Sequence, residues 1–130
     1  MKSYSSEFLV ISRGQWDGGK SAEQIQSAIE AFYVWHDQLV ETGRMRPGQR
    51  LAKPARIVSR DGVMDGPFSE AKEVIGGYWH FLADSLDEAA QLAAQNPCLA
   101  CGLSCEIRPI EPRKCNAYET GSEKPGGDNE

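Results

Sequence analysis

The sequence predicts an α+β domain with a split βαβ arrangement, in which a four-stranded antiparallel sheet carries two helices on one face. Two observations lead to this prediction. The expected elements follow the order strand, helix, strand, strand, helix, strand. Apolar and polar residues also alternate along the expected strands, which predicts one covered sheet face and one open face. A chain of 130 residues has room for one such domain with a single core.

The first half of the pattern begins with an apolar, β-branched run at residues 8–13, which predicts a strand. Ser21, followed three residues later by Gln24, forms a capping box that starts a helix, and Gly43 ends it. Residues spaced three or four apart place one apolar face on this helix. They are Ile25, Ile29, Phe32, His36 and Leu39.

The second half starts with residues 47–54, which we expect to be irregular because they hold prolines and a glycine. Residues 55–59 are expected as the second strand, with a turn at 60–62, and residues 74–83 as the third. Ser85 and Glu88 predict a second capping box and a helix that ends at Asn96 and Pro97. Residues 104–110 supply the last strand.

Alternation along the last two strands assigns side chains to the two sheet faces. Trp79 and Phe81 are expected to face the helices, and so are Cys105 and Ile107. The open face then holds a polar set together with enough apolar surface that pairing with a second copy, a homodimer, is expected. The polar set is Tyr78, His80, Glu106 and Arg108.

Composition excludes several classes of partner. A net charge of −5 without a basic stripe argues against nucleic acid, whose binding needs clustered Lys and Arg. The apolar run at residues 8–11 is too short for a signal-peptide core or a membrane span, so we expect a cytoplasmic protein with no membrane partner. Residues 1–110 are expected as the domain. Residues 111–130 lack Leu, Ile, Val, Phe, Met and Trp and are expected as a flexible polar tail.

Residues 63–78, VMDGPFSEAKEVIGGY, resemble the signature of YCII-related (DGPF) proteins. The segments at 83–89 and 105–110, and Trp35 followed by Gly43, are similar to the same family, so the resemblance covers residues 7–110. It implies a ferredoxin-like fold that forms a dimeric α/β barrel. It implies less about function, because most members are uncharacterised and some occur beside or fused to alternative sigma factors.

A related branch of this family carries a His–Asp pair thought to be catalytic and includes a dehydrochlorinase of aromatic degradation. In this chain the His position falls on Phe32 and the Asp position on Asn96, so the resemblance implies that the pair is absent. An acid–base mechanism copied from that branch therefore lacks its proton carrier. His36, one helical turn further along, could substitute.

Two motifs suggest other chemistry. Residues 14–21, GQWDGGKS, fit the P-loop pattern, but a P-loop needs a parallel sheet and Asp17 would place a carboxylate in the phosphate cradle. We expect a solvent loop with a helix-capping serine. Cys98, Cys101 and Cys105 offer at most three thiolates, whereas a structural zinc site takes four ligands. We expect them to pack in the interior, and we expect no metal and no cofactor.

The candidate site residues lie on the open face, the DGPF loop and the first helix. Asp65 and His80 are the candidate catalytic residues. The candidate ligand-binding residues are Trp35, His36, Lys72, Glu73, Tyr78 and Arg108. Each has a structural alternative. His36 and Trp35 could pack in the core, Lys72 could form a solvated ion pair with Glu73, and Arg108 could form a salt bridge across the dimer.

The sequence thus favours a homodimer that binds a small polar or aromatic molecule in the dimer cleft, with lyase or isomerase chemistry as one outcome. Asp65 would orient or deprotonate the ligand, His80 would shuttle a proton, and Arg108 would hold an anionic group. The alternative is a non-catalytic regulatory or protein-interaction module of the sigma-factor-associated type.

Overall fold

The computed structural model describes residues 4–65, 74–118, 121 and 123. Its elements are β1 (Ser6–Arg13), α1 (Ala22–Glu41), β2 (Met45–Arg50), β3 (Arg56–Ser59), β4 (Gly62–Asp65), β5 (Ile75–Ala83), α2 (Leu86–Ala93), the short 3₁₀ helix η2 (Pro97–Cys101) and β6 (Ser104–Pro109). The α+β class predicted from the sequence is therefore confirmed.

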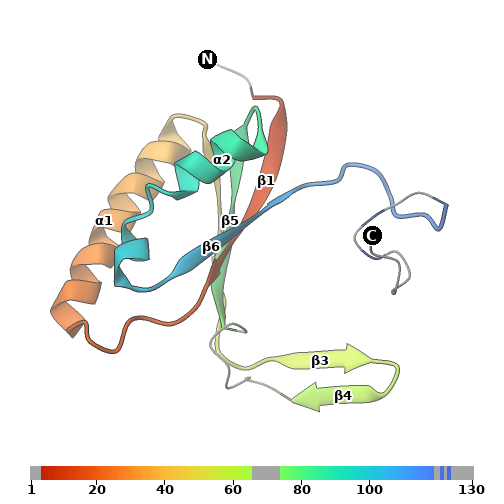
Figure 1. The fold of residues 1–130 in the computed structure, drawn as a ribbon, viewed down its shortest axis with the longest axis horizontal. Helices are drawn as coiled ribbons and strands as arrows, with labels where there is room; N and C mark the ends of the chain where they lie inside the picture. The colour runs from red at the N-terminus through yellow and green to blue at the C-terminus, as the bar shows by residue number, and fades with distance from the viewer. Residues whose placement is uncertain (1–3, 66–73, 119–120, 122, 124–130) are drawn as a thin grey trace.

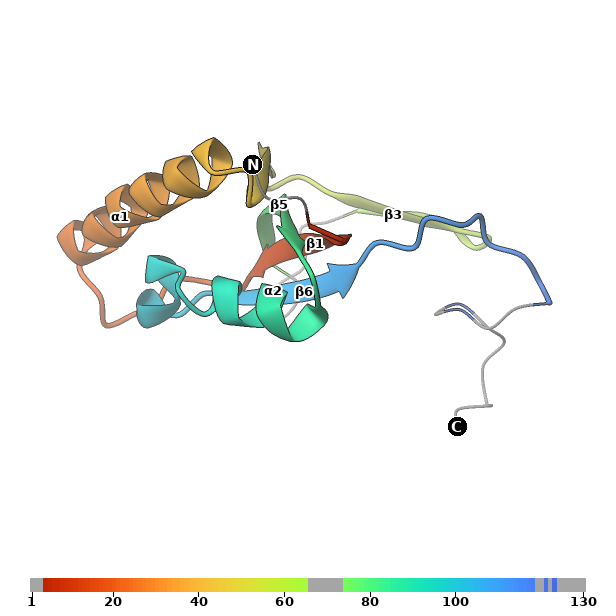
Figure 2. The same cartoon turned by 90° about the horizontal axis from the view of Figure 1, so that it is seen from above.

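The main sheet has the strand order β2-β5-β1-β6, and all neighbouring strands are antiparallel. Both helices lie on the same side of this sheet, to the left of it in Figure 1 and again on one side in Figure 2. This is the split βαβ order that the sequence predicted. The other face of the sheet carries no helix among the described residues.

The second strand of the sheet differs from the prediction. It is β2, whose Pro47 and Gly48 were expected to be irregular, and not the segment 55–59. The register of β2 against β5 shifts between Arg46 and Gln49, so Pro47 and Gly48 form a bulge. A Cβ atom on Gly48 would collide with the backbone carbonyl of Tyr78, so glycine is required there. Because β2 is an edge strand, the missing N–H of proline is tolerated.

The segment expected as the second strand instead forms a hairpin of its own. Among the described strands, β3 and β4 pair only with each other, and they extend away from the end of the main sheet (Figure 1, bottom). The predicted turn at 60–62 is confirmed, with Ser59 opposite Gly62 and Gly62 at a φ of 119°. This two-stranded hairpin is separate from the four strands that complete the fold.

The core lies between the helices and one face of the sheet. Phe81 and Val10 are fully buried, and Trp79 is 7% exposed. The ring of Phe32 lies 5.3 Å from that of Trp79, and the ring of Trp35 meets Phe81 edge-on at 6.1 Å. The predicted alternation is thus confirmed.

The helix starts follow their predicted caps with one difference. Ser21 and Gln24 make both bonds of the capping box. Ser85 accepts the N–H of Glu88 at 3.0 Å, but the carboxylate of Glu88 accepts the N–H of Asp84 at 2.7 Å and not that of Ser85. The second capping box is therefore only half formed.

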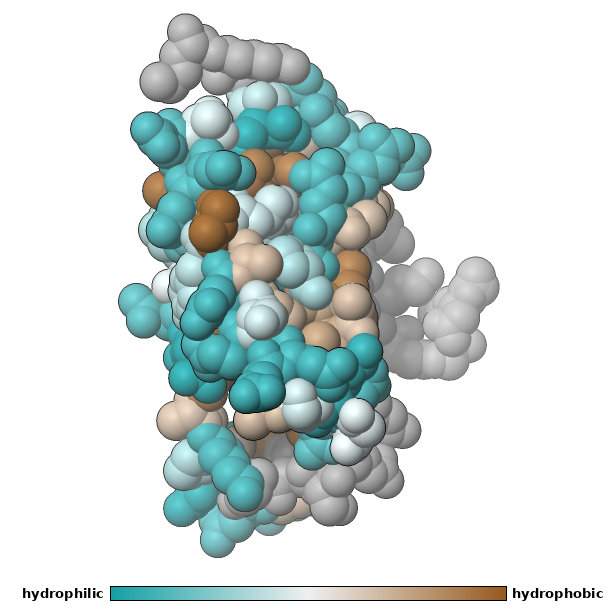
Figure 3. All heavy atoms as spheres, turned by 90° about the vertical axis from the view of Figure 1, so that its left-hand side faces the viewer, coloured by the Kyte–Doolittle hydropathy of each residue, from teal (hydrophilic) through white to brown (hydrophobic). Residues whose placement is uncertain are grey.

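Residues 111–118 follow β6 as exposed chain without a helix or strand (Figure 1, blue). Across the described ranges 4–65 and 74–118, no helix combines the length and apolar character needed to cross a membrane. The α1 side of the molecule is largely hydrophilic, with scattered apolar patches (Figure 3).

Candidate functional site

The open face of the main sheet carries two rows of side chains that run across the strands. Strand pairing places Arg46, His80, Leu9 and Arg108 in the first row. The second row is Gln49, Tyr78, Ile11 and Glu106. Because neighbouring strands lie about 4.8 Å apart, each row spans about 15 Å. We call these eight residues the open-face site.

Charge on the open face is arranged around two carboxylates. Arg13 and Arg108 both contact Glu106, at 3.1 Å to Oε1 and 3.2 Å to Oε2. Arg46 contacts Glu7 at 3.1 Å. Two arginines therefore share the carboxylate of Glu106 on this face. A guanidinium that shares its carboxylate in this way can also bind an anionic group.

His80 lies at the middle of the open-face site. Its ring centroid is 6.1 Å from that of Tyr78, edge-on at 84°, and both residues are half-buried. Leu9 separates His80 from Arg108 by one strand. An imidazole changes charge near neutral pH and can move a proton, while the tyrosine offers a hydroxyl and an aromatic surface.

Two of the candidate ligand-binding residues lie on the other side of the sheet, on α1. The ring of Trp35 packs against the core, and its indole Nε1 donates to Oε1 of the exposed Gln95 at 3.5 Å. His36 Nδ1 lies 2.9 Å from Asp37 Oδ1, and the His36 side chain is 19% exposed. The sheet thus separates both residues from His80, and their contacts match the packing alternative given above.

Asp65 ends β4 in the hairpin, where its carboxylate contacts Arg56 at 3.0 Å and is 78% exposed. Since the hairpin forms a separate sheet, a single chain does not bring Asp65 beside His80 or Arg108 (Figure 1). Lys72 and Glu73, the remaining candidates, lie outside the described residues.

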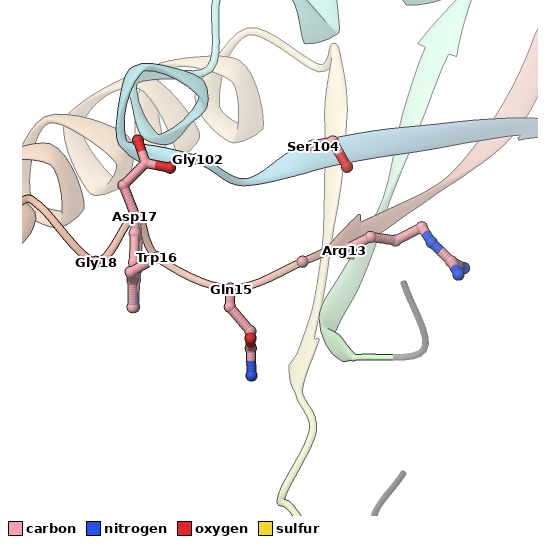
Figure 4. Close-up of a pocket in the computed structure, with 8 residues that line it drawn as sticks. Arg13, Gln15, Trp16, Asp17, Gly18, Gly102 and Ser104 are labelled. Carbon is pink, nitrogen blue, oxygen red and sulfur yellow. The ribbon is translucent and has the colours of Figure 1, made fainter. Parts of the chain in front are cut away.

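The loop with the P-loop pattern borders a shallow hollow between β1, η2 and β6 (Figure 4). Three of its backbone N–H groups are bonded to carbonyl oxygens within the chain. Gly14 donates to Val74 at 3.0 Å, Asp17 to Cys101 at 2.8 Å, and Lys20 to Asp17 at 3.2 Å. A phosphate cradle needs such groups free and convergent, so these three are not available to a phosphate.

Cys98 and Cys101 lie in a small buried cluster with Ala28 of α1, Cys105 packs against the main core, and Cys115 is exposed. Cys98 is buried, and its Sγ lies 3.7 Å from the Ala28 carbonyl oxygen. Burial, and secondarily the neighbouring thiols of Cys101 and Cys105, raises the pKa of Cys98 to about 11. Burial also raises the pKa of Cys105, whose Sγ accepts a bond from Asn96 at 3.6 Å. Neutral thiols with partners of this kind fit interior packing. Within the described ranges, no three His, Cys, Asp or Glu side chains gather as a metal site.

Several open-face residues were missed in the sequence. Glu7, Leu9, Ile11 and Arg13 alternate with the buried Phe8 and Val10. That alternation is visible in the sequence, but the run 8–13 was predicted only as a strand, without an assignment of its residues to the two faces. Arg46 was missed because β2 was expected to be irregular.

A small α+β protein with an uncovered, charged sheet face is the class that these features define. The sequence profile of the YCII-related domain matches residues 10–113, so the chain belongs to the YCII-related family, as the DGPF signature predicted.

Two similar proteins extend this comparison. An uncharacterised protein of Rhizobium meliloti (strain 1021) is 34% identical over 88 residues, which cover 65% of this chain and 68% of that protein. Among solved structures, 5-chloro-2-hydroxyhydroquinone dehydrochlorinase from Burkholderia phenoliruptrix AC1100, in complex with 2,5-dihydroxybenzoquinone, is similar at 17% identity and a TM-score of 0.46. That match covers 81% of this chain and 93% of that chain.

Proposed function

We propose that the protein is a homodimer that binds a small polar or aromatic molecule with an anionic group between the open sheet faces of its two copies. The observation that carries this proposal is the placement of Tyr78, His80 and Arg108 on one uncovered face, across three adjacent strands. These residues combine an aromatic surface, a proton carrier and a cation within the reach of one small molecule.

Arg108 is the group that would hold the anion. Its guanidinium shares Glu106 with Arg13, and the Arg108 side chain is 54% exposed. A ligand carboxylate can replace part of this shared pairing and can meet a guanidinium through two parallel hydrogen bonds. Tyr78 would lie against an aromatic ring of the ligand, and His80 would transfer a proton. A lyase or isomerase reaction needs such a proton carrier.

The second copy is proposed from the apolar residues of the same face. Leu9, Ile11 and Leu82 lie on the open face and remain partly exposed. An apolar sheet face without a covering layer favours association, and a two-fold dimer would cover both copies with the same contact. The ligand would then lie where polar side chains interrupt the apolar contact.

A thermal-shift screen tests this function. The purified protein is heated with small carboxylates, phenols, lactones and nucleotides, together with the variants His80→Ala and Arg108→Ala. A ligand at a hundredfold excess over its Kd stabilises by about 2.7 kcal/mol, a measurable shift in Tm. We expect a compound whose shift disappears in both variants.

Matched controls are His36→Ala, the other histidine of the chain, and Arg113→Ala, an arginine beyond β6. Both should keep the shift. A ligand whose binding survives both open-face variants would place its site elsewhere. No ligand from any class would favour the non-catalytic interaction module in place of the binding protein.

A further inference from the structure

The β3–β4 hairpin exposes large apolar side chains on both of its faces. Ile57 pairs with Met64 and Val58 with Val63 across the two strands, so each pair occupies a different face. These side chains are 46%, 57%, 74% and 65% exposed, respectively. Among the described elements, β3 and β4 have their substantial contacts only with each other.

Such a hairpin is not stable alone. An isolated two-stranded hairpin is marginal in water, and it needs a further strand or a packed layer on an apolar face. Here each face carries one apolar cross-strand pair, next to the Arg56–Asp65 ion pair on one of them, and the hairpin leaves the body of the molecule (Figures 1 and 2). The hairpin therefore has the composition of an arm that is covered by another surface.

The position of the arm in the chain identifies that surface. The arm is inserted between β2, which ends at Arg50, and β5, which begins at Ile75, and these strands are neighbours in the main sheet. The arm thus extends from one end of the main sheet. In the proposed homodimer, the open face of that sheet meets a second copy. A two-fold contact there would bring each arm to the other copy.

The area that a stable interface needs also supports a second copy of the chain as the surface that covers the arm. Four strands at about 4.8 Å spacing and about six residues of 3.3 Å each give the sheet face a flat area of about 400 Å². A stable interface buries about 800 Å² of accessible surface per partner, a quantity that follows the side chains and is larger than the flat outline of the same contact. The arm supplies additional apolar area at the edge of that face, and it does so twice in a symmetric dimer.

We propose that the β3–β4 hairpin of each protomer is a dimerisation arm that packs on a second copy of this chain and covers the part of the open-face site on β2 and β5, which includes His80. This proposal rests on the homodimer of the proposed function. It also gives Asp65 a place, because the acid–base role predicted for that carboxylate would then act across the interface and not within one chain.

Charged substitutions on the arm test the proposal. The double variant Val58→Lys/Val63→Glu places opposite charges on one cross-strand pair, so the hairpin itself keeps its pairing. Ile57→Lys/Met64→Glu does the same on the other face. The control is Val34→Glu, which lies on α1 with a similar exposure of 60%. Circular dichroism verifies that each variant is folded.

Dimer affinity, measured by analytical ultracentrifugation, is the first readout. At least one arm variant should raise the dimer Kd about tenfold or more, because burying a Lys–Glu pair in the interface costs desolvation that the apolar side chains do not. The control should leave the Kd unchanged. The hairpin face whose variant has the larger effect is the face that contacts the second copy.

Acylation of histidine by diethyl pyrocarbonate is the second readout, followed by peptide mass spectrometry. The chain has two histidines, so His36 on α1 is an internal control for His80. We expect His80 to react slowly in the dimer and at least severalfold faster in the arm variant that weakens it. His36 should react at the same rate in both.

The outcomes separate the two proposals. If the parent protein is a dimer and the arm variants keep both its Kd and the slow reaction of His80, the dimerisation arm is wrong. The homodimer itself is then still supported. A parent protein that is monomeric at every concentration overturns the homodimer, and the arm with it.

Discussion

The two faces of β5 show how one strand serves two purposes. Trp79, Phe81 and Ala83 point to the helices and are 7%, 0% and 0% exposed. Tyr78, His80 and Leu82 alternate with them on the opposite face and are only half-buried. The strand therefore alternates between residues that hold the fold together and residues that are available to a ligand or a second copy. Function can change on one face without cost to the other.

The largest expected effect comes from removing a core ring. Phe81→Ala should lower the free energy of unfolding by about 3–5 kcal/mol, because it deletes a fully buried aromatic side chain and leaves a cavity. His80→Ala, one residue away on the open face, should cost less than about 1 kcal/mol. Urea denaturation of both variants measures the contrast. Equal losses would contradict the division between the faces.

The next largest effect is a dependence of the free energy of unfolding on pH, which arises from a buried thiol on the core side. Burial raises the pKa of Cys98 from 9.0 to about 11, so the folded protein holds this proton more tightly than the unfolded chain. Stability is full below about pH 9 and falls by up to about 3 kcal/mol as the pH rises through about 11.

Urea midpoints between pH 8 and 10.5 test this dependence, and Cys98→Ala is the comparison. The variant should lose part of the decline that the parent protein shows at high pH. Identical slopes would mean that the Cys98 thiol titrates alike in the folded and unfolded chains.

A smaller effect on stability is expected at Trp79, where good packing of the ring is combined with an unpaired polar group. Its indole Nε1 is buried without a hydrogen-bond partner among the described residues. Trp79→Phe removes that unpaired donor and also some packing, so the two terms oppose each other. We expect a net change of about 1 kcal/mol in urea denaturation. A loss above about 3 kcal/mol would show that the indole N–H has a partner, such as a bound water.

The smallest effect on stability belongs to the open face. Glu106→Gln removes the carboxylate shared by Arg13 and Arg108, whose side chains are 30% and 54% exposed. Partly exposed ion pairs contribute little, so the free energy of unfolding should change by less than about 1 kcal/mol.

The same variant should bind anionic compounds more tightly, because two guanidinium groups lose their carboxylate partner. Titration calorimetry with a carboxylate found in the thermal-shift screen measures this gain. Unchanged affinity would remove Arg108 from the proposed ligand site.

Local patterns in the sequence predicted most of the fold. The strand β1, both helix starts and the strands β5 and β6 follow from apolar spacing and from capping residues such as Ser21 and Ser85. The strand β2 did not follow, because its bulge depends on the approach of Gly48 to the backbone of Tyr78. That contact joins residues 30 positions apart, and it has no signature in the segment itself.

The candidate site was predictable to the same extent. Tyr78, His80 and Arg108 were placed on one face by alternation alone, and the strand registers agree. Arg46 was lost together with β2. The separation of Asp65 from His80 could not be predicted from the sequence. It arises because the β3–β4 hairpin leaves the main sheet, and which strands pair is decided by tertiary contacts that the local sequence does not show.

Both outer strands of the main sheet carry a proline, Pro47 in β2 and Pro109 at the end of β6. A proline has no N–H to offer to an incoming strand, and the bulge at Gly48 turns the β2 edge further from a flat template. Each outer strand therefore has fewer N–H groups to offer for the strand addition that begins fibril growth. The proposed association through the open face would leave both of these edges unchanged.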